Sequence, residues 1–280
     1  PTAADSIEFQ IGATESEQGI EGIEGLSEGS LGNRNMSYQY QHLNWSHLSE
    51  QGNKTQLVVY HNDLHLDDDV KPRELSGVLE ELGVPMIPGI PDTTIFDGSH
   101  IADSERWDME FRASIRPASN LRAVTGAAVR YDRVSSQSLF DTLNTLSETS
   151  YRAYSNLEWA QSEQVIVNAG VILEDRDNTD IYSSYRLATN YLVDEDHTFR
   201  VALNRSFRAP TMLENNQKGF IRYVNPQECN SDSPILECNP LLRDIILDAG
   251  AISDADIKNE ELKSYELGYA GYFMDRALSL

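Results

Sequence analysis

The sequence contains no run of about 18 consecutive apolar residues, which is the length that a transmembrane helix needs. Its first residues, Pro1–Asp5, carry neither a basic region nor an apolar core, so no signal peptide is recognised there. Positive charge is also in short supply, because 22 Lys and Arg stand against 45 Asp and Glu, a net charge of -23. Such a chain repels polyanions, which excludes a nucleic-acid partner.

What the sequence does contain is strict alternation between apolar and polar residues. In the segment Trp107–Arg116 every second residue, beginning with Trp107, is apolar, and the residues between them are polar or charged. A period of two is typical of a strand with one apolar and one wet face. Ten residues in a tilted strand are also about enough to cross the hydrocarbon core of a bilayer.

Similar segments recur along the chain, and the connections between them alternate between short and long. They are Ser6–Ala13, Met36–His47, Thr55–Leu64, Trp107–Arg116, Leu121–Tyr131, Tyr151–Ala160, Val165–Leu173, Tyr182–Val193, Thr198–Phe207, Leu262–Phe273 and Arg276–Leu280. The longest connections are 65–106 and 208–260. Outer-membrane barrels have short periplasmic turns and longer extracellular loops.

We therefore predict an all-β fold in which residues 1–280 supply about ten strands of a larger antiparallel transmembrane β-barrel. An open sheet would leave unpaired edges, which lipid does not tolerate, so we infer a larger closed barrel. The apolar rows are assigned to lipid and the residues between them to the lumen. The rows are Val165, Val167, Ala169, Val171 and Leu173; Phe199, Val201 and Leu203; and Tyr265, Leu267, Tyr269 and Phe273.

Two motifs lie on consecutive predicted strands. The first is Phe207-Arg208-Ala209-Pro210 followed by Glu214, and the second is Tyr265-Glu266-Leu267-Gly268. In this order they resemble a signature of TonB-dependent outer-membrane receptors. Asn259 stands where that family usually has Pro, and Asn239-Pro240-Leu241 looks like a separated half of the second motif, which suggests an insertion.

The resemblance implies a barrel of about 22 strands filled by a plug domain, in the outer membrane of a Gram-negative bacterium, facing lipid and lipopolysaccharide. It implies active uptake of a scarce ligand, driven by TonB through the plug. The family's ligands are ferric siderophores, haem, cobalamin and sugars, of which we favour a ferric siderophore. No enzymatic activity and no cofactor are expected. Neither a plug nor a TonB box is recognised in this sequence.

Arginines on the wet faces are the candidate ligand contacts, because guanidinium groups suit carboxylate, catecholate and phosphate. Arg130 and Arg152 lie nearest the predicted mouth, and we predict that they bind ligand together with Trp107 and Tyr131. The alternative is a ladder of ion pairs across neighbouring strands. It would join the arginines Arg112, Arg116, Arg122, Arg130, Arg152 and Arg200 to the acids Glu110, Asp132, Glu158 and Glu266.

The remaining candidates lie mostly in the long connections. Cys229 and Cys238 are expected to form a disulfide, since a cell-surface loop is oxidising and no histidine lies nearby to complete a metal site. His61 and His65 would be about 13 Å apart on a strand, too far to share an ion. Asp67–Asp69 lacks an EF-hand pattern and is assigned to solvent. Helical spacing predicts short helices at Leu75–Leu82 and Leu241–Ile246.

Two other functions were weighed. A barrel hydrolase would need a nucleophile, histidine and acid at one rim, but the six histidines are scattered and none has an evident nucleophile partner. A passive porin would not carry the paired motifs and would lack a plug. Sequence preceding Pro1 would separate these alternatives.

Overall fold

The structure is a computed structural model that describes residues 4–21, 30–70, 73–74, 85, 95–97, 100–177, 181–224, 246–253, 257–273 and 278–279. Eleven strands form one sheet in the order β1-β2-β3-β6-β7-β8-β9-β10-β11-β14-β15. They are β1 Ala4–Glu21, β2 Ser30–Leu48, β3 Lys54–Val70, β6 His100–Ala118, β7 Leu121–Ser135, β8 Leu146–Ala160, β9 Val165–Arg176, β10 Tyr182–Leu192, β11 His197–Arg208, β14 Glu260–Phe273 and β15 Leu278–Ser279. All neighbouring pairs in this sheet are antiparallel.

The sheet confirms the predicted all-β fold, and each predicted strand occurs. Several strands are longer than their alternating segments. For example, β3 continues to Val70, and β6 already begins at His100. These two strands therefore take up both ends of the predicted loop 65–106. Among the helices that the structure describes, none is long and apolar enough to span a bilayer.

A second, smaller sheet and two short helices are formed by the connections. The sheet has the order β13-β12-β5-β4, with β4 Arg73–Glu74, β5 Ile95–Asp97, β12 Lys218–Val224 and β13 Ile246–Ile252. The helices are α2 Gln137–Phe140 and α3 Met212–Asn216. Of the two predicted loop helices, residues 75–82 and 241–245 lie outside the described residues, and Ile246 begins β13 instead.

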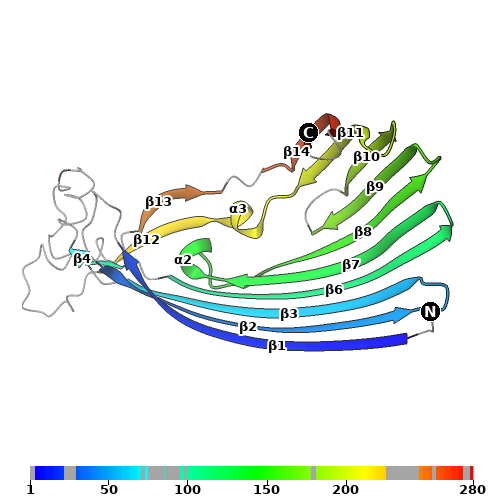
Figure 1. Cartoon of the computed structure of the whole chain (residues 1–280). Helices are drawn as coiled ribbons and strands as arrows, with labels where there is room; N and C mark the ends of the chain where they lie inside the picture. Colours follow the sequence, from blue (N-terminus) through cyan, green and yellow to red (C-terminus); the bar gives the residue numbers. More distant parts are fainter. Residues whose placement is uncertain are drawn as a thin grey trace, which may run out of the picture.

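Connection length sorts the two ends of the large sheet as predicted, except that the connection 177–181, at the end with the long connections, is as short as the turn 49–53. Short turns at 49–53, 119–120, 161–164 and 193–196 lie at one end, which is on the right in Figure 1. Gly52 has a φ of +79° in the first of these turns, a left-handed conformation that glycine adopts without steric cost. The connections 71–99, 136–145 and 209–259 leave the opposite end, where β4, β12 and β13 are found.

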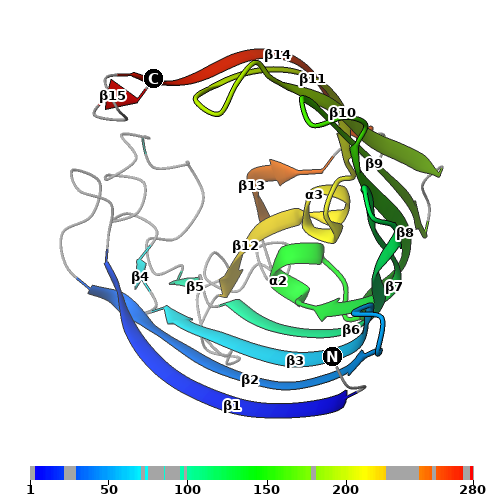
Figure 2. The ribbon, with the colours of Figure 1, turned by 45° about the vertical axis from the view of Figure 1, so that its right-hand side comes forward.

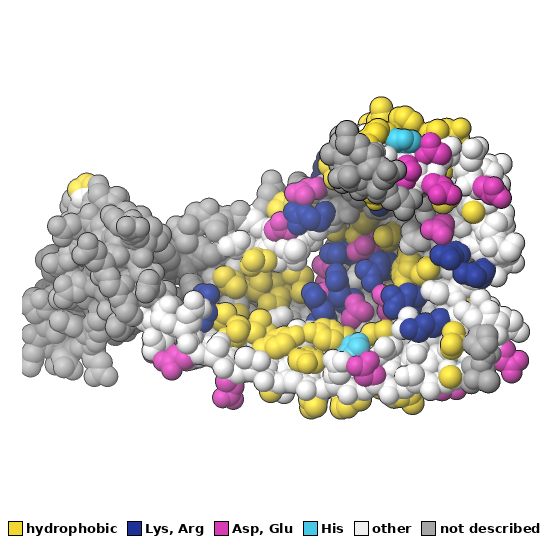
Figure 3. Space-filling view, in the orientation of Figure 1, with side chains coloured by type: hydrophobic (Ala, Val, Ile, Leu, Met, Phe, Trp, Pro, Cys, Tyr) yellow, Lys and Arg dark blue, Asp and Glu magenta, His cyan; other side chains and the backbone are white. Residues whose placement is uncertain are grey.

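The large sheet curves around a hollow, with β1 and β15 at its two edges (Figure 2). The helices α2 and α3 and the strands β12 and β13 lie on its concave side (Figures 1 and 2). Arginines and acids gather inside this hollow (Figure 3). Large apolar side chains point the other way: Phe111 is 49% exposed and Leu267 is 84% exposed.

Register explains how the two faces are separated. Residues paired across strands share a face, and successive residues in a strand point to opposite faces. One concave row therefore runs across six strands through Arg122, Glu158, Asn168, Ala188, Ala202 and Glu266. A convex row beside it runs through Leu157, Ala169, Leu187, Leu203 and Tyr265. A slip of one residue would exchange these faces.

Close approach of a tyrosine ring requires glycine at position 126. A Cβ atom added to Gly126 would lie 2.6 Å from the hydroxyl oxygen of Tyr154 and 2.7 Å from the backbone oxygen of Phe111. Gly126 and Tyr154 are register partners on β7 and β8. The missing side chain thus makes room for the ring to lie along the concave wall.

Candidate functional site

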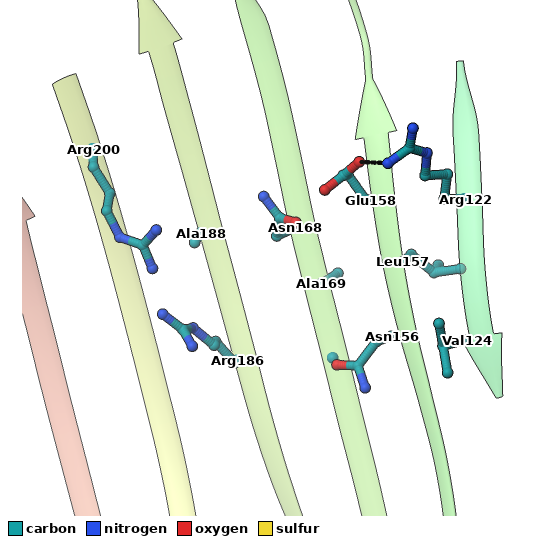
Figure 4. Close-up of a pocket in the computed structure, with 11 residues that line it drawn as sticks. Arg122, Val124, Asn156, Leu157, Glu158, Asn168, Ala169, Arg186, Ala188 and Arg200 are labelled. Atoms are coloured by element: carbon teal, nitrogen blue, oxygen red, sulfur yellow. Dashed lines mark ion pairs between the residues drawn. The ribbon is translucent and has the colours of Figure 1, made fainter. Parts of the chain in front are cut away.

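Ion pairs line the concave wall, and they confirm the predicted ladder in part: two of the four cross to a neighbouring strand, as Arg122–Glu158 does in Figure 4, Arg130–Asp132 lies within β7, and Arg152–Glu110 reaches across β7 from β8 to β6. Each of the four predicted acids has an arginine partner. The distances are 3.1 Å for Arg130–Asp132, 3.4 Å for Arg152–Glu110, 3.5 Å for Arg122–Glu158 and 4.0 Å for Arg200–Glu266. Arg112 instead donates to Gln56 at 3.0 Å, and Arg116 has no ion pair with any described residue.

The two predicted ligand arginines differ in how firmly they are held. Asp132 lies between Arg130 and Arg106, and its contact to the Nε atom of Arg106 is 2.5 Å. Arg152 is held by one long hydrogen bond to Glu110, whose other oxygen accepts from the hydroxyl of Tyr154 at 2.6 Å. The side chain of Arg152 is 39% exposed, against 28% for Arg130. The Nε atoms of both arginines have no hydrogen-bond partner among the described residues, and the more exposed side chain of Arg152 makes its donors the more accessible to an anion in the hollow.

Trp107 and Tyr131 are not brought together with these arginines. They pair with one another in register on the convex face, whereas Arg130 and Arg152 lie on the concave face. Alternation is the reason, because Tyr131 follows Arg130 directly and must point to the opposite side. Trp107 stacks on His61 at 4.1 Å and donates its indole N–H to Glu105 at 3.0 Å.

Aromatic residues bound the apolar convex band on both sides. Trp107, Tyr131 and Tyr151 lie toward the long connections, and Trp159 and Tyr191 lie toward the short turns. From Tyr151 to Trp159 the strand advances by about 27 Å, which for a strand tilted by about 40° is about 21 Å along the barrel axis. Transmembrane barrels have an apolar band of similar height between two aromatic girdles.

A group of aromatic side chains on the concave face was not predicted. The hydroxyls of Tyr38 and Tyr60 are 2.5 Å apart, and Tyr40 lies 6.5 Å from the Tyr60 ring. The ring of His42 is 6.5 Å from that of Tyr60. Tyr60 is also in the same register row as Arg130, two strands away. The period-two order of Tyr38, Tyr40 and His42 in the sequence is the signal that could have found this group.

The first motif forms a junction between β11, α3 and β14. The guanidinium of Arg208 donates to both oxygens of Glu214 at 2.9 Å, and to the oxygens of Glu260 at 2.9 and 3.0 Å. Glu214 also completes a capping box with Thr211 at the start of α3. Ala209 and Pro210 are buried, and Phe207 lies 4.6 Å below the guanidinium of Arg205. Arg208 thus joins the last residue of one strand to the first residue of the next strand in the wall.

The second motif lies in the membrane band of β14. Tyr265 and Leu267 are each 84% exposed on the convex face, and Glu266 points to the concave face, where it accepts from Asn204 at 2.9 Å. Gly268 is the register partner of Arg200. A Cβ atom at Gly268 would lie 3.7 Å from that of Arg200, which is ordinary contact.

The Arg208 junction makes a prediction for titration of Glu214, which lies in α3, outside the membrane strands. Hydrogen bonds from Arg208, followed by those from Thr211, lower the pKa of Glu214 to about 2. Its carboxylate contacts should therefore be fully present above the ordinary pKa of about 4.3 and be lost as pH falls through about 2. Carbon-13 NMR of the Glu214 carboxyl, assigned with Glu214→Gln, should show this low midpoint. In Arg208→Gln the midpoint should rise toward the ordinary value, and an unchanged midpoint would contradict the junction.

The other sequence candidates are accounted for as follows. The prediction that Asp67–Asp69 faces solvent is wrong for Asp68, which is buried and accepts from the guanidinium of Arg34 at 2.6 and 2.7 Å. His61 contacts Gln41 and Glu105, whereas His65 contacts Asp103 at 2.6 Å. In the described part of the chain no group of three or more potential metal ligands occurs. Cys229 and Cys238 lie outside the described residues, so their disulfide stays a prediction.

A curved antiparallel sheet with a charged hollow, an apolar outer band and aromatic girdles is the wall of a transmembrane β-barrel. The family comparison is more specific. The family model described as TonB dependent receptor-like, beta-barrel matches residues 13–280. The chain therefore belongs to the TonB-dependent receptor β-barrel family, whose members are receptors of the bacterial outer membrane and not enzymes. A comparison with curated proteins gave no match.

Solved structures agree with the fold. The siderophore receptor PirA from Acinetobacter baumannii is similar with a TM-score of 0.60 and 13% identity, covering 96% of this chain and 39% of its own. The ferric yersiniabactin uptake receptor FyuA from Yersinia pestis has a TM-score of 0.50 and 12% identity, with 98% and 41% covered. The chain thus spans about two fifths of the length of these receptors.

Proposed function

We propose that this chain forms part of the barrel wall of an outer-membrane receptor that takes up a ferric siderophore, with energy supplied by TonB. The observation that carries the proposal is the family barrel, with its concave wall lined by arginines and tyrosines. Ferric siderophores commonly present carboxylate or catecholate oxygens, for which guanidinium groups and aromatic rings are suitable partners. The similar structures are a siderophore receptor and a ferric yersiniabactin uptake receptor, which supports the same ligand class.

Ligand contact is assigned to Arg152 and Arg130, together with Tyr38 and Tyr60 on the same concave face. Trp107 and Tyr131 are omitted, because they lie on the convex face and would meet lipid headgroups instead. The end with short turns is assigned to the periplasm. The connections within 65–106 and 208–260 are assigned to the cell exterior, where Cys229 and Cys238 would be oxidised.

The proposed partners follow from this orientation. TonB would act through a plug domain inside the closed barrel, and the convex band would contact outer-membrane lipid. Lipopolysaccharide would lie beside the convex residues beyond the Trp107 girdle. A passive porin is the alternative, and its transport would not depend on TonB.

Iron uptake tests the proposal directly. Cells that depend on the complete receptor, supplied with a panel of radiolabelled ferric siderophores, should accumulate iron from at least one of them, and deleting TonB should abolish uptake. Arg152→Gln should raise the siderophore concentration that gives half-maximal uptake by about tenfold or more, which is the scale of one charge-assisted hydrogen bond. Arg116→Gln removes the same charge outside the site and should have little effect. Undiminished uptake without TonB would favour the porin.

A further inference from the structure

Two neighbouring strands of the wall carry cations on the convex face, at the border of the apolar band. On β11, Arg205 is the next convex residue after Leu203 in the direction of the long connections. On β14, Lys263 is the next convex residue after Tyr265 in the same direction. Arg205 and Lys263 are register partners, and their side chains are 35% and 57% exposed. The two cations therefore lie side by side at the edge of the face assigned to lipid.

The charges of this pair are not balanced. Among the described residues both cations share one acid, Glu261, which lies 2.5 Å from the Nε atom of Arg205 and 3.2 Å from the Nζ atom of Lys263. The two terminal nitrogens of the Arg205 guanidinium have no hydrogen-bond partner in the described part of the chain. One positive charge thus remains uncompensated, in a chain whose net charge is -23.

Acids stand along the same border on other strands. The convex residues just beyond the band include Glu15 on β1, Glu105 on β6 and Asp175 on β9. Arg133 on β7 is a cation, but it donates to Glu105 at 3.1 Å, so its charge is compensated. Phosphate groups of a lipid would be repelled by the acidic parts of this border and attracted to β11 and β14.

Aromatic rings hold Arg205 at the height of the membrane interface. Its guanidinium lies 4.6 Å from the centre of the Phe207 ring, a contact that keeps the group against the wall. Tyr185, the register partner of Arg205 on β10, is 43% exposed on the convex face. Exposed tyrosines are typical of the aromatic girdle, which lies at the level of the lipid headgroups.

Lipid A, the membrane anchor of lipopolysaccharide, carries phosphate groups between its acyl chains and the outer sugars. The fork of an arginine matches phosphate in two-point contacts, and a lysine adds a point charge. We propose that Arg205 and Lys263 bind a phosphate group of lipid A on the outer surface of the barrel. The proposal names a site for the lipopolysaccharide partner and rests on the proposed orientation in the outer membrane, but not on the identity of the siderophore.

The probe is lipid A that carries its phosphates, and the same lipid after removal of the phosphates is the control. With the complete receptor purified in detergent, native mass spectrometry should show saturable binding of the phosphorylated lipid, even in an excess of phosphatidylglycerol. Arg205→Gln should weaken this binding by about fivefold or more, the scale of one basic side chain beside an anionic lipid. Arg116→Gln removes the same charge at the end with the short turns and should bind lipid A as the wild type does.

Glu261→Gln distinguishes phosphate binding from a structural role of the cations. The carboxylate of Glu261 competes with phosphate for both Arg205 and Lys263, so its removal should strengthen binding of lipid A. A pair that merely stabilises the wall would gain nothing from losing its acid. The shift in gel mobility on heating shows whether each variant is folded, and Lys263→Gln tests the same site if Arg205→Gln does not fold.

Four results would overturn the site: equal binding of the lipid without phosphates, displacement by phosphatidylglycerol, equal loss in Arg205→Gln and Arg116→Gln, or binding in Glu261→Gln that is no stronger than in the wild type. Siderophore uptake separates this site from the proposed function. Because Arg205 lies outside the lumen, folded Arg205→Gln should take up iron as the wild type does, whatever its affinity for lipid A.

Discussion

Phe111→Arg is expected to prevent most of the complete receptor from assembling in the outer membrane. Phe111 lies in the apolar convex band between Met109 and Ala113, and 49% of it is exposed on the face assigned to lipid. An arginine at the midplane of a bilayer on the lipid face costs about 2–4 kcal/mol. That is a large part of the stability of an ordinary folded domain, about 5–15 kcal/mol.

Ser114→Arg provides the matched control on the same strand. Ser114 is the register partner of Val124, which lines the concave hollow, so an arginine there would face water. The folded fraction can be followed by the shift in gel mobility on heating and by the amount recovered in outer-membrane fractions. Equal loss in both variants would remove the assignment of faces on which the barrel depends.

Gly126→Val is expected to destabilise the wall by about 1–3 kcal/mol or more, the usual cost of overpacking. The new Cβ atom would meet the ring of Tyr154 and also a backbone oxygen of Phe111 at 2.7 Å, and the backbone cannot turn aside as a flexible side chain can. The hydrogen bond from Tyr154 to Glu110, which orders Arg152, should be lost as well. Chemical unfolding in detergent would measure the loss.

Gly268→Ala serves as the control for this variant, since its Cβ atom would meet Arg200 only at 3.7 Å. It should unfold at nearly the wild-type denaturant concentration. Wild-type stability in Gly126→Val would mean that the tyrosine ring does not lie over this position.

The wall could be predicted from the sequence because alternation is a local property. The segment Trp107–Arg116 shows its two faces without reference to any neighbour, and the lengths of the connections then assign the strand ends. Strand limits could not be obtained this way. Residues 65–70 and 100–106 extend above the apolar band and have no apolar face, so cross-strand pairing alone reveals them as strand.

The site was partly predictable for the same reason. The ion pairs Arg122–Glu158 and Arg200–Glu266 join neighbouring strands, as alternation predicted, whereas the pair Arg152–Glu110 reaches across an intervening strand and was not expected. The prediction of Trp107 and Tyr131 as ligand contacts did not take alternation into account. Each directly follows an arginine of the concave face, Arg106 or Arg130, and therefore points to the opposite face. The absence of an acid beside Arg186 (Figure 4) could not be foreseen, since its register partners, Gly170 and Asn204, are known only once the strands are paired.

The Arg208 junction has a consequence for how such a receptor can change over evolutionary time. Arg208 and Glu260 are register partners, so both ends of the long connection are anchored at one place in the wall. With its ends already held together, doubling the length of a flexible connection adds only about 0.6 kcal/mol of closure entropy. New residues can therefore be accepted between these anchors, so that this connection can vary in length and sequence while the strands of the wall keep their register.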